Sequence, residues 1–242
     1  MGTDKPTSHI TMTLPEKTVK AQNISQSNEL TEAAYDLSIQ SKRVLWLCLM
    51  QCYNSMDQGK DLGEEFTINV ADYQRIFKVG KVTASNDVKK GVEGLLTSYV
   101  RFYPKDDDED AVSRPWLAEA GVRLAKGKWR IELNSKIIPF IQGLTEKFTK
   151  YSLIDVSKLN SVRIIRLYES FCQFRSSGIW VTTPEWLAER FSLPESQRAN
   201  FSEMKRSFLT PALKKINANT PLEAALTRNE KGQLIFSIIE KN

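Results

Sequence analysis

The sequence contains little histidine and little cysteine, and this scarcity excludes several kinds of site. Its single histidine, His9, lies in a polar N-terminal stretch, so histidine-dependent catalytic triads and multi-histidine metal centres cannot form. The three cysteines have no CxxC spacing, which argues against a zinc ribbon or a disulfide framework. Cys48 and Cys52 lie four residues apart in an apolar stretch and are expected to be buried thiols. We therefore predict neither a metal nor another cofactor.

Long apolar runs and phosphate-binding glycine loops are also absent. The longest apolar run, Val44 to Met50, is much shorter than the roughly 20 residues that a membrane span requires. No apolar signal core is found near the N-terminus, so we expect a soluble cytoplasmic protein with no membrane partner. The chain also lacks a GxxxxGK motif, which argues against nucleoside triphosphate binding by that device.

The sequence does have a basic charge balance. Lys and Arg number 34 against 29 Asp and Glu, which gives a net charge of +5 over 242 residues. Five of the acids form one run, Asp106 to Asp110, and without them the net charge would be +10. A basic body favours a polyanionic partner such as DNA. The acidic run is interpreted as a solvated or hairpin-tip loop, facing away from DNA, rather than as a cation site, because consecutive acids point in different directions.

The order of elements predicts an α+β fold of two tandem winged-helix domains related by internal duplication. We expect a disordered tail over 1–25, an N-terminal winged-helix domain over 26–146 and a C-terminal winged-helix domain over 147–242. Each half reads as helix, strand, two helices and a strand hairpin, and the halves align at an offset of 114, with Tyr73 and Phe77 on Leu187 and Phe191. The helices are expected over 38–53, 71–79, 83–97, 135–143, 162–175, 184–191 and 201–219. The strands are expected over 66–70, 99–103, 116–124, 129–133, 179–182, 222–227 and 233–240.

Two of these helices are candidate DNA-recognition helices. In a winged helix the second helix of the helix-turn-helix enters the major groove, while the hairpin wing contacts the backbone or the minor groove. Arginine can bind guanine with two hydrogen bonds, whereas lysine and serine more often hold phosphates. The segment from residue 197 onward carries a net charge of +4. For either helix alone, the polar and basic residues could equally form a solvated face with no ligand. Because the same pattern occurs in both helices, DNA binding is favoured. The candidate DNA-binding residues are Ser85, Asn86, Lys89 and Lys90; Lys126 and Lys128 in the hairpin; and Arg198, Lys205, Arg206, Ser207, Lys214 and Lys215.

Three local features of the sequence carry further expectations. Thr31 is placed to cap a short helix that runs to Tyr35. An interior proline costs about 3 kcal/mol in a helix, so Thr210 is expected to cap a new segment at Pro211, with a kink or two abutting helices as the result. Gly91 is expected to weaken the first recognition helix by about 1 kcal/mol relative to alanine.

The sequence also resembles the iteron-binding plasmid replication initiators, particularly the F plasmid type. The resemblance extends from about residue 26 to the end of the chain and includes both halves. It is carried by Gln26 to Tyr35, Lys42-Arg43, Ile138 to Ile141, Gly143-Leu144, Phe148-Thr149, Arg166 to Arg175, Glu189-Arg190, Leu193-Pro194, Phe208-Leu209, Ile216-Asn217 and Thr220-Pro221. Lys205-Arg206-Ser207 departs from the three arginines of the F type, so a different base sequence should be read.

This resemblance implies a protein that binds tandem origin repeats (iterons) in double-stranded DNA as a monomer. It further implies melting of adjacent DNA and contacts with the host initiator and the replicative helicase. As a dimer, such a protein represses its own promoter through an operator inverted repeat, and chaperones shift the dimer to the monomer. In the family the C-terminal recognition helix reads most of the bases, and the N-terminal domain carries the dimer interface.

Three alternatives differ in what they require. A plain transcriptional repressor would use the same two domains on one palindrome rather than on direct repeats. A nicking initiator enzyme would require a paired-histidine metal site, which one histidine cannot supply, so no enzymatic activity is predicted. A protein that bridges two plasmid DNAs would be compatible with the initiator hypothesis.

Overall fold

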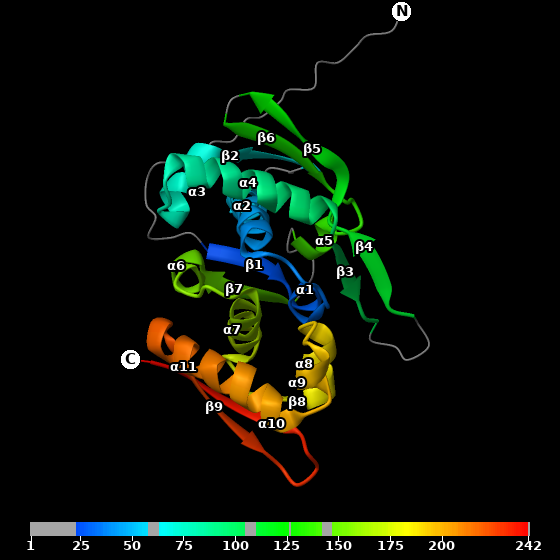
Figure 1. Cartoon of the computed structure of the whole chain (residues 1–242), viewed down its shortest axis with the longest axis vertical. Coiled ribbons are helices and arrows are strands. Elements are labelled where there is room, and N and C mark those ends of the chain that lie inside the picture. Colours follow the sequence, from blue (N-terminus) through cyan, green and yellow to red (C-terminus); the bar gives the residue numbers. More distant parts are fainter. Residues whose placement is uncertain (1–22, 58–62, 105–109, 126, 142–146, 242) are drawn as a thin grey trace, which may run out of the picture.

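The computed structural model describes residues 23–57, 63–104, 110–125, 127–141 and 147–241. Two helix-rich halves lie one above the other, with a short two-stranded sheet between them (Figure 1). Each half contains a module of helices packed with a three-stranded antiparallel sheet, so the winged-helix prediction is confirmed for both.

The first module has its three-stranded sheet in the order β2-β6-β5. Its last two strands form the wing, and their register is interrupted by irregularities. Its elements are α2 (Ile39–Asp57), β2 (Glu65–Asn69), α3 (Val70–Phe77), α4 (Lys81–Leu96), β5 (Leu117–Ala125) and β6 (Lys128–Leu133).

The second module repeats the connectivity, with sheet order β8-β10-β9. Its first elements are α7 (Val162–Phe174), β8 (Ile179–Thr182), α8 (Pro184–Arg190) and α9 (Glu195–Arg198). A continuous helical rod follows, made of α10 (Phe201–Met204), a π-helical segment η2 (Lys205–Leu209) and α11 (Thr210–Asn219). The wing strands are β9 (Leu222–Arg228) and β10 (Leu234–Glu240).

The turn after the third element of each module shows that the repeat is structural as well as sequential. Lys78 after α3 has φ 52° and Ser192 after α8 has φ 48°, and these positions differ by the offset of 114 seen in the sequence. At the next residue, the Val79 amide donates to Gln74 and the Leu193 amide donates to Ala188, again at equivalent positions. The same unusual left-handed turn therefore closes both helices, as duplication predicts.

The remaining elements lie around the centre of the molecule. The two-stranded sheet pairs β1 (Asn23–Ser27) with β7 (Phe148–Ser152), two segments more than 120 residues apart in the chain. A second two-stranded sheet, β3 (Tyr99–Phe102) and β4 (Val112–Pro115), projects from the first module (Figure 1). Three short helices complete the fold: α1 (Asn28–Glu32), α5 (Ile138–Ile141) and α6 (Leu153–Ser157).

Several expectations about these elements were wrong. Residues 23–25, assigned to the tail, belong to β1, because β7 supplies a partner that local patterning cannot reveal. Thr31 does not cap α1: the cap is Ser27, whose hydroxyl accepts the Leu30 amide at 3.0 Å, while Thr31 lies inside the helix. Strand β4 was not predicted. The expected domain boundary at 146/147 stays a prediction; it falls just before β7, the strand that pairs with β1.

The core runs through both modules, and the predicted apolar stripes face it. Tyr73, Phe77, Leu187 and Phe191, the residues that aligned the halves, are all buried. The three cysteines are buried free thiols, as expected, and burial raises the pKa of Cys52 to about 12. Within the described ranges, the model contains no helix with the length and apolar character of a membrane span.

Gly91 has a packing role that the sequence did not indicate. A Cβ atom there would lie 2.6 Å from a Val44 methyl group and 2.7 Å from the Gln40 carbonyl, both on α2. At Gly94 it would lie 2.3 Å from the Ser41 hydroxyl. The interpretation of Gly91 as a weakness of α4 is therefore incomplete, because its missing side chain lets α4 cross α2 at close range.

Candidate nucleic-acid interface

Helix α4 presents one polar face to solvent. Asn69 caps the preceding helix α3 by accepting the Ala71 amide at 3.0 Å, and the left-handed turn at Lys78 then redirects the chain into α4. The helix buries Ala84, Val88, Val92 and Leu95 against the core. The four predicted contact residues, Ser85, Asn86, Lys89 and Lys90, are all exposed on the other side.

The helical rod of the second module is also divided into a buried and a polar side. Asn200 caps it by accepting the amides of Ser202 at 2.9 Å and Glu203 at 3.3 Å. Its apolar stripe is buried from end to end, through Met204, Phe208, Ala212 and Ile216. The residues predicted to contact DNA, Lys205, Arg206, Ser207, Lys214 and Lys215, are exposed along the rod, as is Arg198 in α9.

Pro211 acts on this rod differently from the expectation. Thr210 has helical dihedral angles and no capping hydrogen bond, so it does not start a separate helix. Instead, the Thr210 amide donates to the carbonyl of Lys205, five residues back, and the preceding turn widens into a π-helix. The proline ring would clash with the carbonyl four residues before it, and a widened turn relieves that clash. The π segment contains Lys205, Arg206 and Ser207, three of the predicted DNA-binding residues.

Hydrogen bonds fix the orientation of several of these side chains. The Arg206 guanidinium donates to the Glu203 carboxylate at 2.7 Å, and this bond lowers the pKa of Glu203. The Ser207 hydroxyl donates to the Glu203 carbonyl at 2.7 Å and accepts the Gln197 amide at 2.9 Å. Lys89, in the first module, lies 3.8 Å from Glu93. Arg206 is thus held in a defined direction while 77% of its side chain stays exposed.

Both wings contain described cations. Lys126 lies outside the described residues, and Lys128 is partly exposed beside Gly127, whose φ of 86° suits the expected tight turn. In the second wing, Arg228 stacks its guanidinium 4.6 Å from the Phe201 ring and donates to the Gly232 carbonyl at 3.1 Å. Arg228 was not among the predicted contacts, although the net charge of its segment includes it. It joins the wing to the first residue of the recognition rod.

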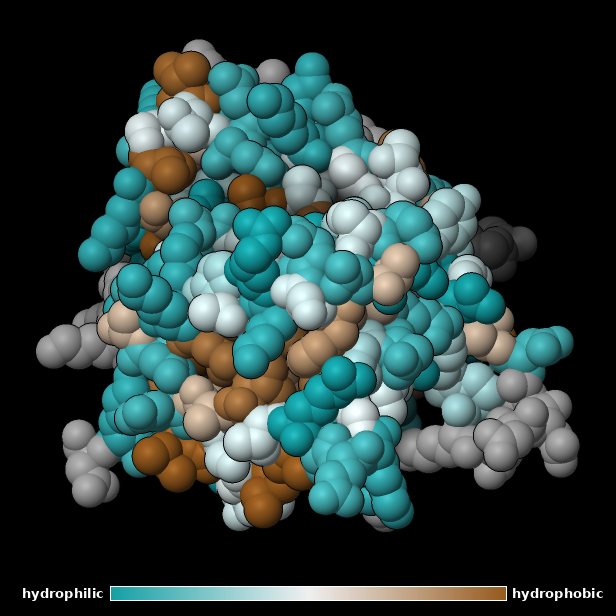
Figure 2. Space-filling view, turned by 60° about the horizontal axis from the view of Figure 1, so that its bottom comes forward, coloured by the Kyte–Doolittle hydropathy of each residue, from teal (hydrophilic) through white to brown (hydrophobic). Residues whose placement is uncertain are grey.

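The two candidate recognition helices lie on the same side of the molecule (Figure 1). Figure 1 draws α4 and the rod of α10 and α11 in the foreground, one in each half. The end of the molecule that carries the second module is largely hydrophilic, with smaller apolar patches (Figure 2). Exposed apolar side chains in this module include Ile179, Val181 and Ile239, on its sheet rather than on the rod.

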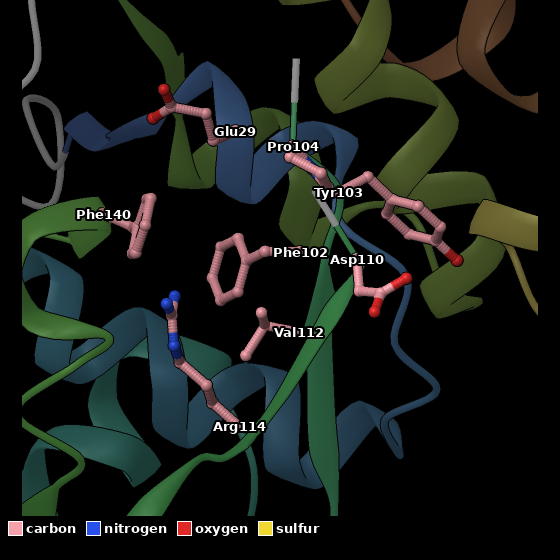
Figure 3. Close-up of a pocket in the computed structure, with 8 residues that line it drawn as sticks. All are labelled: Glu29, Phe102, Tyr103, Pro104, Asp110, Val112, Arg114 and Phe140. Atoms are coloured by element: carbon pink, nitrogen blue, oxygen red, sulfur yellow. The ribbon is translucent and has the colours of Figure 1, made fainter. Parts of the chain in front are cut away.

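A small pocket lies away from both helices, between the β3–β4 hairpin, α1 and α5. It is lined by Glu29, Phe102, Tyr103, Pro104, Asp110, Val112, Arg114 and Phe140. Figure 3 shows the Arg114 guanidinium directed toward Phe102 and Phe140, and it lies 5.2 Å and 5.5 Å from those two rings. Of the predicted acidic loop 106–110, only Asp110 is described, and it is exposed at the pocket edge. Among the described residues, no group of three or more His, Cys, Asp or Glu side chains is arranged to hold a metal ion.

Comparison with known families matches both modules. Residues 23–172 match the model described as "Initiator Replication protein, WH1", and residues 183–239 match "Initiator Rep protein, WH2". The two matches together include both candidate recognition helices.

Similar individual proteins extend over most of the chain. An Escherichia coli protein described as an uncharacterized 27.6 kDa protein is 55% identical over 229 residues, covering 92% of this chain and 96% of the relative. A second E. coli protein, of 6.6 kDa, is 64% identical over 56 residues, which is 23% of this chain and 98% of that relative. Among solved structures, the Pi initiator protein in complex with iteron DNA superposes with a TM-score of 0.72 at 19% identity, covering 91% of this chain and 98% of that chain. That likeness shows a shared fold.

Proposed function

We propose, since this chain belongs to the initiator replication protein family, that it starts plasmid replication by binding repeated sites in double-stranded origin DNA. The observation that supports this most is the duplicated module, which presents a cation-bearing recognition helix in each half on one side of the molecule. Two recognition helices in one chain suit a DNA site longer than a single winged-helix domain can contact. The similar fold of an initiator bound to iteron DNA is consistent with direct repeats as the ligand.

In this proposal the second module reads bases and the first mainly holds the backbone. Arg206 is exposed and directed by Glu203, which suits two-point recognition of a guanine. Lys205, Ser207, Lys214 and Lys215 lie beside it and suit phosphate contacts. In α4, Ser85, Asn86, Lys89 and Lys90 form the corresponding face. Lys128, Arg198 and Arg228 extend the interface to the wings and to α9, and Lys126 is proposed from the sequence alone.

The family resemblance supports further steps. We propose that the monomer acts on iterons, promotes melting of the adjacent DNA and recruits the host initiator and helicase. We propose that a dimer formed through the first domain represses the chain's own promoter at an inverted repeat, with chaperones shifting the balance to monomer. These steps require no catalytic residue in this chain, and plasmid DNA places them in the cytoplasm.

Binding to defined duplexes tests the proposal. The chain should bind direct repeats from the DNA flanking its gene, with an affinity that falls steeply with salt, by a log–log slope of about 0.9 for each phosphate neutralised. A single palindrome bound well, with no repeated sites nearby, would favour the plain repressor instead. Equal affinity for the repeats and for scrambled duplexes of the same length would reject sequence-specific initiation.

A further inference from the structure

Helix α7 carries a polar stripe that is buried rather than solvated. Arg166, Glu169 and Gln173 lie at spacings of three and four, which places them on one face of the helix. Arg166 is 2% exposed and Glu169 is 1% exposed, although both carry charge. Buried charges persist only where partners satisfy them, so this face must be matched by groups on neighbouring elements. Those groups come from both halves of the chain.

Arg166 connects three segments through one guanidinium. It donates to the Tyr35 carbonyl at 3.0 Å and to the carbonyls of Ala33 and Arg190. Its guanidinium also lies 3.9 Å from the Tyr35 ring and 4.7 Å from the Phe191 ring, between the two. The segment between α1 and α2 is thereby joined to α7 and to the end of α8.

A buried ion pair lies one turn further along α7. The Lys42 ammonium of α2 lies 2.9 Å from a Glu169 oxygen and donates to the Tyr35 hydroxyl at 2.8 Å. Tyr151 of β7 donates to the same carboxylate. Burial lowers the pKa of Lys42, but the adjacent Glu169 carboxylate and Tyr35 outweigh it and raise the pKa above its ordinary value. Lys42 therefore keeps its charge at neutral pH.

These contacts link the two recognition helices through a short path. Helix α4 packs on α2 at the close approach of Gly91 and Gly94. Helix α2 is joined to α7 by Lys42 and Glu169, and α11 packs directly on α7. Every step in this path is a packed helix crossing or a buried, hydrogen-bonded charge.

We propose that Arg166 and the Lys42–Glu169 pair are positioning residues that fix the distance and rotation between α4 and the η2–α11 rod. The clamp, as we name these three residues, thereby sets the number of base pairs between the two parts of the DNA site. The inference rests on the proposed function for its DNA consequence. Inserting one base pair between the two parts of the DNA site moves one part by about 3.4 Å along the duplex and turns it by about 34°. Two recognition helices held rigidly relative to each other cannot follow this displacement.

The distance between the helices tests the clamp without DNA. Spin labels on Val82→Cys in α4 and Ala218→Cys in α11 occupy exposed positions, while the native thiols are buried, with the pKa of Cys172 raised to about 12. The otherwise unchanged chain should give one narrow distance distribution, and Arg166→Met should give a broad one. Arg163→Met is the matched control, because Arg163 donates at 2.9 Å to Ser192, within the second module. An Arg166→Met distribution as narrow as that of the control would overturn the proposal.

A second variant controls for a folding defect in Arg166→Met. Lys42→Met combined with Glu169→Gln removes both charges and keeps the side-chain volumes, a change that buried ion pairs often tolerate. It should also broaden the distance distribution while circular dichroism and the cooperativity of unfolding stay intact. A narrow distribution in this folded variant would equally overturn the proposal.

Base-pair insertion tests the consequence on DNA. With a duplex selected from random sequence by the wild-type chain, one inserted base pair between the two protected segments should weaken wild-type and Arg163→Met binding by about tenfold or more. Arg166→Met should lose less than about threefold on the same insertion. Uniform weakening of Arg166→Met on both duplexes, with the insertion penalty unchanged, would reduce Arg166 to a structural residue and contradict the inference. If wild type selects no sequence, the proposed function fails, while the distance measurement still decides on the clamp.

Discussion

The two modules share one plan but differ in the helix that would meet DNA. Up to Leu193 they correspond at a constant offset, but α9 then occupies the place where α4 begins in the first module, and the second recognition rod starts six residues later, at Phe201. Helix α4 has glycines where it crosses its neighbour, whereas the rod has Ala212 in its buried stripe and a π turn before Pro211. Duplication therefore kept the scaffold, and the recognition surface diverged.

The difference suggests that the two helices contact different parts of the DNA. In the rod, Arg206 lies in the widened turn and is directed by Glu203, a geometry that suits specific base contacts. In α4, the cations Lys89 and Lys90 project from a regular helix, a pattern that suits phosphates. The second wing adds Arg228, stacked on the start of the rod. Four sets of substitutions can break or sharpen this contrast.

The largest effect is expected from Arg206→Ala. It should weaken binding to the selected duplex by about 1–3 kcal/mol and relax base preference at one position. Competition binding against duplexes with each base at each position measures both quantities. Equal losses on all sequences would make Arg206 a phosphate contact and remove the main difference between the modules.

Gly91→Ala should destabilise the first module without touching the second. The new methyl group would meet the Gln40 backbone carbonyl at 2.7 Å, so the helices must separate, and we expect a loss of about 1–3 kcal/mol in the free energy of unfolding. Urea denaturation measures it. Gly94→Ala provides the comparison, because its methyl group meets only the Ser41 hydroxyl, and adding Ser41→Ala should restore most of the loss. Unchanged stability in Gly91→Ala would show that the close crossing is unimportant.

Pro211→Ala should move stability and specificity in opposite directions. An amide at position 211 can bond to Ser207 in the regular α-helical pattern, so the free energy of unfolding should rise, by at most about 3 kcal/mol. The π turn that carries Arg206 would close, and discrimination between the selected duplex and a scrambled one should fall a fewfold, by about 1 kcal/mol. Denaturation measures the free energy of unfolding, and competition binding measures the discrimination between the two duplexes. Undiminished discrimination in a stabilised variant would show that the π turn has no part in recognition.

The smallest effect is expected from Lys89→Ala and Lys90→Ala. Each should weaken binding on all sequences alike and reduce the log–log salt slope by about 0.9. Lys90 should matter slightly more, because Lys89 is already near Glu93 in the free protein. Salt titrations of the selected and scrambled duplexes measure this. A sequence-dependent loss would give α4 a base-reading role and erase the contrast with the rod.

The sequence predicted the parts of the fold that depend on local pattern. Periodicity predicted the observed bounds of β8 and placed α8 to within one residue, and Thr183 caps α8 by accepting the Trp186 amide at 3.1 Å. The β1–β7 pairing joins distant segments, so no local pattern could reveal it. The π turn is a response of the whole rod to Pro211, and its register depends on packing as well as on the proline.

For the candidate site, the sequence predicted which side chains are exposed, but it did not predict how the two halves of the chain contact each other. The four α4 residues and the rod residues face solvent, because the apolar stripe on the opposite side fixed which side is buried. The clamp was missed because Arg166 and Glu169 lie in a helix that is otherwise mostly apolar, and their partners Tyr35 and Lys42 are more than 120 residues away in the chain. Two charges at a spacing of three in such a helix are the signal that could have indicated it.

Selection of binding sites from random duplex DNA by the 242-residue chain tests the central claim most directly. The account predicts one recovered motif with two conserved parts at a fixed separation, the more sharply defined part protected by the second module. Arg206→Ala should then select a motif degenerate at one position within that part. Recovery of no motif at all, with binding that depends on salt but not on sequence, would contradict the account.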